Sequence, residues 1–444
     1  MTHLDPLDGI PLAAFEGRRA AVLRALGHGV MVLPAAPILY RSRDTEVPYR
    51  PDSELYYVTG ATEPGTVAVL VGGSEPRLIL FVRERDDDAE LWSGPRLGPE
   101  EASERLGASE TYGLSELDFR LQGLLRAGDR MHVRLGRDPA LDRAVLEALA
   151  EARARGPRKG TGPRGVVDPG EILDEMRLVK DAHEIARLRA AATLSVEGHK
   201  EGLAGLCPGA GEWEVQARVE AAFRRGGGSG PGYGTIVGSG ANACVLHYVD
   251  NRRVVQDGDV VLVDAGAELG LYQGDITRTY PANGSFTTAQ RALYEVVEAA
   301  RAAAVARVAP GVTVEAVHAA ATRSLVEGLV SLGVLAGAVD DLVAQEAWRA
   351  FFPHQTSHWL GLDVHDPGDY MRGGVSRSLA AGMVLTVEPG LYVPAGQEGA
   401  AAPWAGMGVR IEDDVLVTPV GCEVLTSALP TPADDVEALV RESR

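Results

Sequence analysis

The segment 354–358, HQTSH, places two histidines at the spacing that zinc hydrolases use on a helix. In the H-E-x-x-H motif of those enzymes, the second residue is a glutamate that activates a metal-bound water. Gln355 occupies that position here. An uncharged amide cannot accept a proton from such a water at neutral pH. The segment therefore indicates either a zinc hydrolase without its base or a different use of the two histidines.

Four acidic residues interrupt apolar segments that we expect to form strands. Asp264 ends VVLVDAG and Asp275 follows in YQGDITRTY, while Glu388 lies in MVLTVEPG and Glu412 in GVRIEDDVLV. A buried carboxylate is costly unless it is paired or binds a cation. One alone is more often a hydrogen-bonded turn residue, but four together exceed what a sheet tolerates without counter-charge. Two divalent cations would balance them, and so many oxygen ligands favour Mn²⁺, Fe²⁺ or Co²⁺, with Zn²⁺ as an alternative.

The histidines with the best claim to this site are His247 in CVLHYVDN and three in HQTSHWLGLDVHD, namely His354, His358 and His365. On one helix the last three would share a face, but Gly361 within the segment and Pro367 after it argue against a helix. On one strand, His358 and His365 would point to opposite faces. We therefore expect strand and loop pieces with a break near Gly361. The other six are expected to be ordinary surface or boundary residues: His3, His28, His132, His183, His199 and His318.

Composition restricts the partners and the compartment. The 444 residues include 43 Lys and Arg against 62 Asp and Glu, so the net charge is −19. Such a field repels phosphate backbones and anionic lipid surfaces, and we expect no nucleic-acid or membrane partner. The start, MTHLDPLDGI, lacks the features of a secretory signal, and no apolar run is long enough to span a bilayer. Three widely separated cysteines are expected as free thiols in a cytoplasmic protein.

The order of elements predicts two domains, residues 1–170 and 171–444. In the first, a helical FEGRRAAVLRAL and a helical LDRAVLEALAEARA flank apolar β-rich runs such as GVMVLP and TVAVLVGG, which predicts an α/β domain with a mixed sheet. The segment 155–170, dense in Gly, Pro and charge, is the expected linker. A long amphipathic helix from residue 171 onward and Gly- and Pro-punctuated strands follow. The whole chain is therefore expected to be α+β, with helices covering a mostly antiparallel sheet in the second domain.

The ordered acidic residues and one histidine resemble the ligand set of a known family. Their flanking sequences are VDAGAELGLYQGDITRTYP, TSHWLGLDVHD, TVEPGLY and GVRIEDD. These resemble the dinuclear metallopeptidases of the pita-bread fold, and within them the proline-specific aminopeptidases (aminopeptidase P, Xaa-Pro aminopeptidase). YRPDSELYYVTGATEPG and ELWSGPRLGPEEA resemble the N-terminal domain of the same enzymes. The resemblance therefore spans nearly the whole chain, and it implies a curved, pita-bread catalytic domain.

The resemblance implies a role for each candidate ligand. Asp264 would bind one metal, His358 and Glu388 the other, and Asp275 and Glu412 would bridge the two. A hydroxide between the metals would attack the carbonyl before proline, with Glu388 as the proton shuttle. The enzyme would then release the N-terminal residue from peptides that begin Xaa-Pro, and Mn²⁺ is the first choice of metal.

Further residues match family positions at the substrate. His247, His354 and His365 match residues that bind substrate and stabilise the intermediate, and an alternative for His365 is to orient a ligand. Arg410 would orient carboxylates, while Tyr233 and Tyr392 are candidates for the pocket wall. Trp92 matches a tryptophan that closes the site of a neighbouring subunit in tetrameric members, so a homodimer or homotetramer is expected.

The chain departs from the family pattern at two places, and three alternatives remain. Gln355 replaces a glycine that the family usually has, and GGGSGPGYG replaces a more aromatic segment. A prolidase has the same fold and metals but cleaves Xaa-Pro dipeptides. A non-catalytic peptide-binding protein of this fold would have no need of five ligands, and a creatinase-like amidinohydrolase works without the metals.

Overall fold

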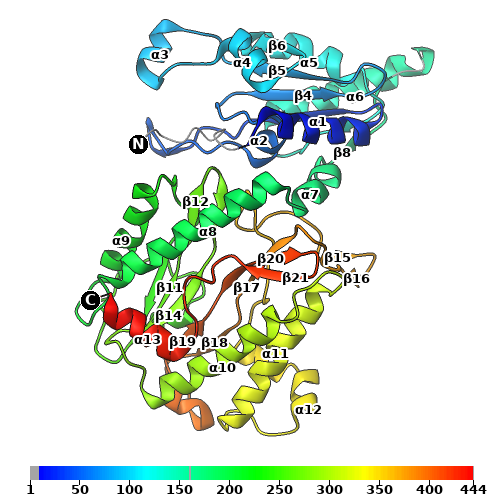
Figure 1. Cartoon of the computed structure of the whole chain (residues 1–444). Coiled ribbons are helices and arrows are strands. Elements are labelled where there is room, and N and C mark those ends of the chain that lie inside the picture. The colour runs from blue at the N-terminus through cyan, green and yellow to red at the C-terminus, as the bar shows by residue number, and fades with distance from the viewer. Residues whose placement is uncertain (1–9, 160–161, 444) are drawn as a thin grey trace. The chain divides into compact units, whose positions relative to one another are not determined.

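The computed structural model describes residues 10–159 and 162–443, and the chain divides into two compact units between Met176 and Arg177 (Figure 1). This division lies inside α7 (Gly170–Leu178), shortly after the predicted boundary at 170/171. The expected linker at 155–170 is wrong in part. Helix α6 (Pro139–Lys159) runs into it, and β8 (Val166–Val167) within it joins a sheet.

The N-terminal unit is built on a mixed six-stranded sheet, as the alternating strand and helix patterns predict. Its strand order is β6–β5–β4–β1–β7–β8, in which β1–β4 and β4–β5 are antiparallel and the other pairs are parallel. The bounds are β1 (Val30–Pro34), β4 (Val67–Val71), β5 (Arg77–Val82), β6 (Glu110–Gly113) and β7 (Met131–His132).

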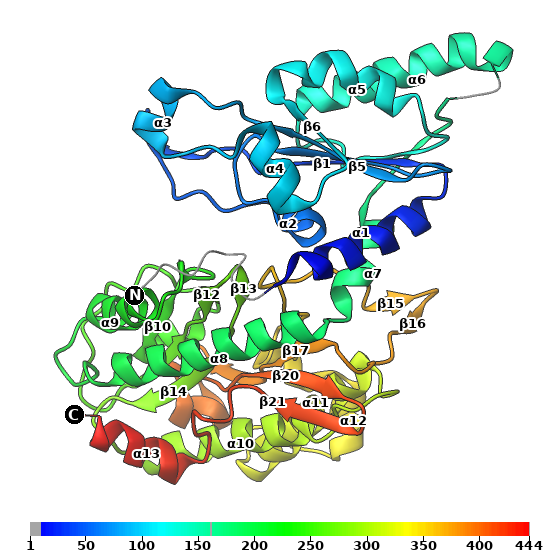
Figure 2. The same ribbon diagram turned by 45° about the horizontal axis from the view of Figure 1, so that its top comes forward.

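Helices cover both faces of this sheet, which explains why its central strands are apolar throughout. Figure 2 shows α5 (Leu117–Leu125) and α6 on one side, and α1 (Leu12–Leu26) and α2 (Ser53–Thr59) on the other. The remaining elements of the unit are β2 (Tyr40–Ser42), β3 (Thr45–Glu46), α3 (Asp87–Ser93), α4 (Gly98–Leu106) and the 3-10 turn η1 (Leu114–Glu116).

The C-terminal unit consists of short antiparallel sheets covered by helices, as predicted (Figure 1). The long helix expected from residue 171 is instead two helices, because Asp181 and Glu184 form a capping box that starts a new one. The helices are α8 (Ala182–Leu203), α9 (Glu212–Arg225), α10 (Thr288–Val305), α11 (Val314–Ser331), α12 (Val339–Ala344) and α13 (Ala433–Glu442), with 3-10 turns η2 (Gly240–Cys244), η3 (Ala347–Ala350) and η4 (Gly399–Trp404).

Two three-stranded sheets, β10–β11–β14 and β17–β20–β21, and the pair β18–β19 form the centre of this unit. Their bounds are β10 (Ile236–Ser239), β11 (Val260–Asp264), β14 (Thr277–Pro281), β17 (Val384–Val387), β18 (Gly390–Val393), β19 (Met407–Arg410), β20 (Asp413–Thr418) and β21 (Gly421–Val424). The shorter strands are β9 (Gly230–Pro231), β12 (Ala267–Leu269), β13 (Tyr272–Gln273), β15 (Met371–Arg372) and β16 (Val375–Ser376). In the part of the chain that the structure describes, no helix is long and apolar enough to cross a membrane.

Candidate active site

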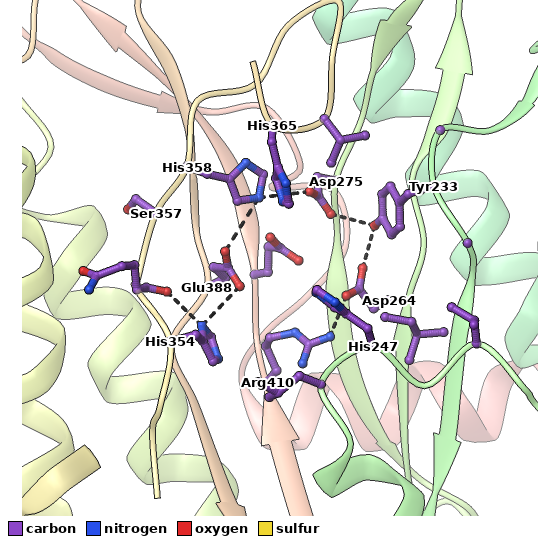
Figure 3. Close-up of a pocket in the computed structure, with 18 residues that line it drawn as sticks. Tyr233, His247, Asp264, Asp275, His354, Ser357, His358, His365, Glu388 and Arg410 are labelled. Carbon is purple, nitrogen blue, oxygen red and sulfur yellow. Dashed lines mark hydrogen bonds and ion pairs between the residues drawn. The ribbon is translucent and has the colours of Figure 1, made fainter. Parts of the chain in front are cut away.

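A pocket of about 690 Å³ in the C-terminal unit brings together nearly all of the candidate site residues (Figure 3). The five candidate metal ligands line it: Asp264, Asp275, His358, Glu388 and Glu412. Five further candidates also line it: Tyr233, His247, His354, His365 and Arg410. Apolar side chains complete the wall, among them Ile236, Leu246, Val249 and Val364. Residues more than a hundred positions apart in the sequence therefore meet in one cavity.

Strand register brings the two aspartates together. β11 and β14 pair so that Asp264 lies opposite Thr277, two residues after Asp275. The chain between them folds back so tightly that a Cβ at Gly266 would lie 1.6 Å from the Gly274 carbonyl oxygen. No side chain fits there, so Gly266 is required for the turn that sets Asp275 beside Asp264.

The two glutamates converge in the same way from the other sheet. β17 and β20 pair so that Val387 lies opposite Asp413, which puts Glu388 and Glu412 at the same end of this pair. Thr277 then connects the two sheets. Its hydroxyl donates to Glu412 Oε2 at 2.6 Å, and its carbonyl oxygen accepts from the Glu412 backbone N–H at 3.0 Å.

The histidine-bearing segment 354–365 contains no helix: it forms one isolated bridge at Trp359 and bends over 361–365. The prediction of strand and loop pieces with a break near Gly361 is therefore confirmed, and the zincin helix is excluded. Trp359 forms an isolated antiparallel bridge with Leu385 of β17. The Thr386 backbone N–H donates to the His358 carbonyl oxygen at 2.9 Å. The segment thus continues the sheet beyond β17 and carries His358 to the carboxylates.

Three candidate ligands form a compact cluster. One ligand atom each from Asp275, His358 and Glu412 lies within 4.8 Å of the others. His358 Nε2 is 3.3 Å from Asp275 Oδ2 and 3.6 Å from Glu388 Oε1. Burial alone would lower the pKa of His358, but the hydrogen bond and charge of Asp275, and then Glu388, raise it to about 9.

Tyr233 contacts both aspartates, and this contact bears on whether the site fits a metal. Its hydroxyl lies 2.5 Å from Asp264 Oδ1 and 2.6 Å from Asp275 Oδ1. A phenol has one proton and donates to only one of these oxygens, so the other carboxylate faces an oxygen lone pair. Among the described lining residues, Arg410 alone carries a fixed positive charge. The site therefore has more carboxylate oxygens than cationic partners, and one carboxylate oxygen faces the Tyr233 hydroxyl without a proton between them. Divalent cations suit such an oxygen-rich site.

Burial also raises the pKa of three of the carboxyl groups. The pKa of Glu388 rises to about 7 and that of Glu412 lies well above its ordinary value, in both cases through burial first and neighbouring carboxylates as well. For Asp264, burial raises the pKa and the Arg410 guanidinium opposes the rise. Four carboxylates in one buried pocket repel one another, and bound divalent cations would reverse that effect.

Arg410 orients the carboxylate of Asp264, as expected. Its Nη2 donates to Asp264 Oδ2 at 2.5 Å, its Nε to the Thr277 hydroxyl at 3.1 Å, and its Nη1 to the Tyr392 hydroxyl at 3.0 Å. Tyr392 in turn lies 2.8 Å from His354 Nε2. A chain of hydrogen bonds therefore runs from His354 through Tyr392 and Arg410 to Asp264.

His354 is held in its neutral form by its surroundings. Burial, and then the Arg410 charge, lower its pKa to about 4. Its Nδ1 lies 2.8 Å from the Gln355 carbonyl oxygen, which can only accept, so Nδ1 carries the proton. Nε2 then accepts from the Tyr392 hydroxyl. The side chain of Gln355 stays free to line the pocket.

The remaining candidates lie at the pocket wall or outside it. The His365 ring packs edge-on against His358, with ring centroids 4.4 Å apart, and His247 faces the cavity from the opposite wall (Figure 3). Trp92 lies on α3 of the N-terminal unit, where it is 89% exposed. Its contact with a neighbouring subunit stays a prediction.

The expected surface position of His199 is wrong. It is 1% exposed, and its Nε2 lies 3.2 Å from the Ala265 carbonyl oxygen and 3.1 Å from that of Ile276. It therefore holds the backbone directly after both candidate metal-binding aspartates. His199 lies four residues after Ser195, so both are on the face of α8 that carries small and apolar residues. This helical spacing could have indicated that His199 is buried.

Two other histidines expected at the surface are also buried in part. His132 is 7% exposed within β7. The Nδ1 of His318 lies 2.7 Å from the Thr356 hydroxyl, beneath the histidine-bearing segment. The contact of His318 has no local signal, because Thr356 lies 38 positions further along the chain.

A buried ionic network anchors the loop that presents His365. The Asp366 carboxylate accepts from Arg177 Nη2 at 2.6 Å and from Lys180 Nζ at 3.0 Å, and all three residues are at most 5% exposed. Arg177 also donates to Asp363 Oδ2 at 2.7 Å. A Cβ at Gly361 would meet the Asp366 carboxylate at 2.5 Å, so the loop closes tightly around it.

Comparisons with known proteins agree with this geometry. Residues 186–419 match the model of metallopeptidase family M24, and residues 15–133 match that of the aminopeptidase P N-terminal domain. The chain is 41% identical to the Xaa-Pro aminopeptidase of Escherichia coli over 433 residues, which cover 97% of this chain and 98% of the relative.

Solved structures are similar over the same extent. The structure of Pseudomonas aeruginosa aminopeptidase PepP has a TM-score of 0.93 and 42% identity, over 98% of this chain and 99% of that one. The zinc-substituted Escherichia coli aminopeptidase P in complex with product has a TM-score of 0.93 and 41% identity, with the same coverage. The expected fold, an N-terminal domain followed by a pita-bread domain, is therefore confirmed.

Proposed function

The chain belongs to metallopeptidase family M24, and on that basis we propose that it is an Xaa-Pro aminopeptidase. It releases the N-terminal residue from peptides that have proline in the second position. The observation that carries this proposal is the meeting of four buried carboxylates and His358 in one pocket. The full-length likeness to enzymes with this name supports it.

Asp264, Asp275, His358, Glu388 and Glu412 are the proposed ligands of two divalent cations, with Mn²⁺ as the first choice. When bound, such a pair activates water as a nucleophile near neutral pH and polarises the substrate carbonyl. Co²⁺, Fe²⁺ and Zn²⁺ are the alternatives.

The residues around this cluster handle protons and orient the peptide. Glu388, whose carboxylate lies 3.6 Å from His354 Nδ1 and 3.6 Å from His358 Nε2, is proposed to carry a proton to the departing proline nitrogen. His354 and Arg410 line the pocket beside it, and the Tyr392 hydroxyl, which lies behind this wall and not in the pocket lining, joins them by hydrogen bonds. His247 and His365 face the same cavity and are proposed to bind the peptide and its tetrahedral intermediate.

Proline explains why a dedicated pocket is needed. A peptide bond to proline has no N–H, so a peptidase that grips this donor loses a contact. The glycine- and aliphatic-rich part of the wall, with Gly232, Gly234, Ile236 and Val249, offers apolar surface for a ring. Shape then supplies the specificity that the missing N–H removes.

Assembly and location belong to the same proposal. Leu91 and Trp92 are 81% and 89% exposed on α3, which supports a contact with another copy of the chain in a homodimer or homotetramer. The protein is proposed to act in the cytoplasm, where its three free cysteines would stay reduced.

The test of the function compares two substrates in the presence of Mn²⁺. An Ala-Pro-Ala tripeptide should be cleaved to alanine and Pro-Ala, while the dipeptide Ala-Pro should be cleaved far more slowly. Chelation and desalting should abolish the activity, and Mn²⁺ should restore it. Cleavage of the dipeptide alone would make the protein a prolidase. No cleavage and no bound metal would support a peptide-binding role instead.

Gln355→Gly should change substrate preference and leave metal binding intact. The side chain lines the pocket, but its residue supplies no ligand atom to the cluster. Removing it enlarges the cavity beside His354, so kcat/KM for tripeptides with a bulky first residue should change relative to Ala-Pro-Ala by roughly threefold to tenfold. Metal content, measured by plasma mass spectrometry, should equal that of the wild type. Loss of metal would contradict the assigned ligand set.

A further inference from the structure

A second pocket of about 710 Å³ shares a wall with the carboxylate pocket. The residues that line both are Gln355, Ser357, His358 and His365. Figure 3 shows Ser357 and His358 on opposite sides of the segment that carries them. The two cavities are therefore neighbours along this segment, close enough for adjacent parts of one peptide to occupy them.

The rest of this pocket comes from two elements that contribute nothing to the metal cluster. The first turn of α11 supplies Val314, Glu315 and His318, and the hairpin β15–β16 with the residue before it supplies Tyr370, Met371 and Ser376. We call this cavity the Glu315 pocket. Ser376 fixes the start of the helix, since its hydroxyl accepts from the Glu315 backbone N–H at 3.2 Å.

Glu315 gives the pocket its negative charge. It is the one carboxylate among the described lining residues, and these include no lysine or arginine. Within the described chain, no hydrogen bond or ion pair engages its carboxylate, unlike Glu327 on the same helix, which lies 3.7 Å from Arg323. Of the histidines that line the pocket, His318 adds no opposing charge, because burial lowers its pKa and its Nδ1 is engaged by Thr356. His358 is already paired with Asp275 and Glu388 on the side of the carboxylate cluster.

The pocket also offers apolar surface next to this charge. Val314 and Met371 line it, and Tyr370 is held in place by stacking on Trp359 with ring centroids 5.1 Å apart. Met371 is 53% exposed, and a flexible thioether adapts to different partners. Lysine and arginine combine an apolar stem with a cationic head, which matches this combination.

We propose that the Glu315 pocket is a substrate subsite that receives a lysine or arginine side chain next to the Xaa-Pro bond, and that Glu315 selects the positive charge. This inference rests on the proposed aminopeptidase function and adds a substrate class to it. An exposed carboxylate and an ammonium group attract weakly, so the preference should be about threefold to fivefold in kcat/KM. An acidic side chain at the same position should be disfavoured.

The test uses two series of tripeptides with Mn²⁺-loaded enzyme. The first is Xaa-Pro-Ala and the second Ala-Pro-Xaa, each with Xaa as lysine, norleucine or glutamate. Norleucine has the stem of lysine without its charge. In one of the series, kcat/KM should be highest for lysine and lowest for glutamate, and the lysine-to-norleucine ratio should shrink at about 0.5 M salt because ions screen the attraction.

Variants locate the source of the preference. Glu315→Gln should bring the lysine-to-norleucine ratio to about one, and Glu315→Lys should invert it in favour of glutamate. Glu327→Gln is the matched control, since it removes a charge from the same helix about 18 Å away along its axis. It should keep the wild-type ratio.

Each outcome has a separate meaning. Equal kcat/KM values for the lysine and norleucine peptides in both series would overturn the subsite. A lysine preference that persists in Glu315→Gln would overturn it as well. Failure of every tripeptide to be cleaved would instead overturn the aminopeptidase function itself.

Discussion

Glu388→Gln should lower kcat/KM on Ala-Pro-Ala by about 10³-fold or more. The carboxylate of Glu388 lies 3.6 Å from His358 Nε2 and 3.6 Å from His354 Nδ1. It therefore contacts both the proposed metal ligands and the histidine beside them. Proton transfer by a positioned side chain contributes about 10²- to 10⁴-fold, and a neutral amide is also a poorer metal ligand. Steady-state kinetics at saturating Mn²⁺, with metal content measured in parallel, give the result.

Glu398→Gln is the control for this variant, because Glu398 is an exposed glutamate ten residues further along the chain. It should have wild-type kinetics. If Glu388→Gln kept more than a tenth of the wild-type kcat/KM, Glu388 would be neither the shuttle nor an essential ligand. Circular dichroism should show that both variants are folded, which separates lost chemistry from lost structure.

Asp366→Asn should destabilise the C-terminal unit by about 3–5 kcal/mol. The substitution keeps the shape of the side chain but leaves the Arg177 and Lys180 cations buried without their shared counter-charge. Breaking a buried pair in this way costs far more than breaking an exposed one. For a unit of this size, we expect the melting temperature to fall by roughly 6–15 °C.

The control for this prediction is Glu423→Gln. It breaks a pair of similar length, Arg189 Nη2 to Glu423 Oε2 at 2.6 Å, whose side chains are 49% and 42% exposed. Its effect should be below about 1 kcal/mol. Adding Lys180→Met to Asp366→Asn should recover part of the loss, because Lys180 has no other carboxylate partner among the described residues, whereas Arg177 keeps Asp363. An unchanged melting temperature for Asp366→Asn would show that the network does not stabilise the loop of His365.

Most of the site residues can be predicted from the sequence. Asp264, Asp275, Glu388 and Glu412 each break an apolar strand, and the cost of a buried carboxylate makes them conspicuous in the sequence alone. The start of α8 can also be predicted from the sequence, since Asp181 and Glu184 form a capping box. The good helix formers on both sides of this box, however, predict one longer helix. Such signals lie within a few residues of one another along the chain.

Other parts of the site have no such local signal. His199 and His318 have the sequence surroundings of surface residues, yet the structure buries them against residues 66 and 38 positions away. Arg177 and Lys180 reach Asp366 across 189 and 186 positions. Helical periodicity hints at the burial of His199, but no pattern identifies its partners.

The sequence by itself determined the ligand types, the strands that carry them and the family, because these depend on residue chemistry and on neighbours along the chain. Only the tertiary structure decided how His354 and His358 contact the carboxylates, how Tyr233 and Arg410 restrain the aspartates, and that a second pocket borders the first. Those features depend on how separate sheets and helices pack against one another. Packing sets distances between residues far apart in sequence, which local periodicity and spacing do not specify.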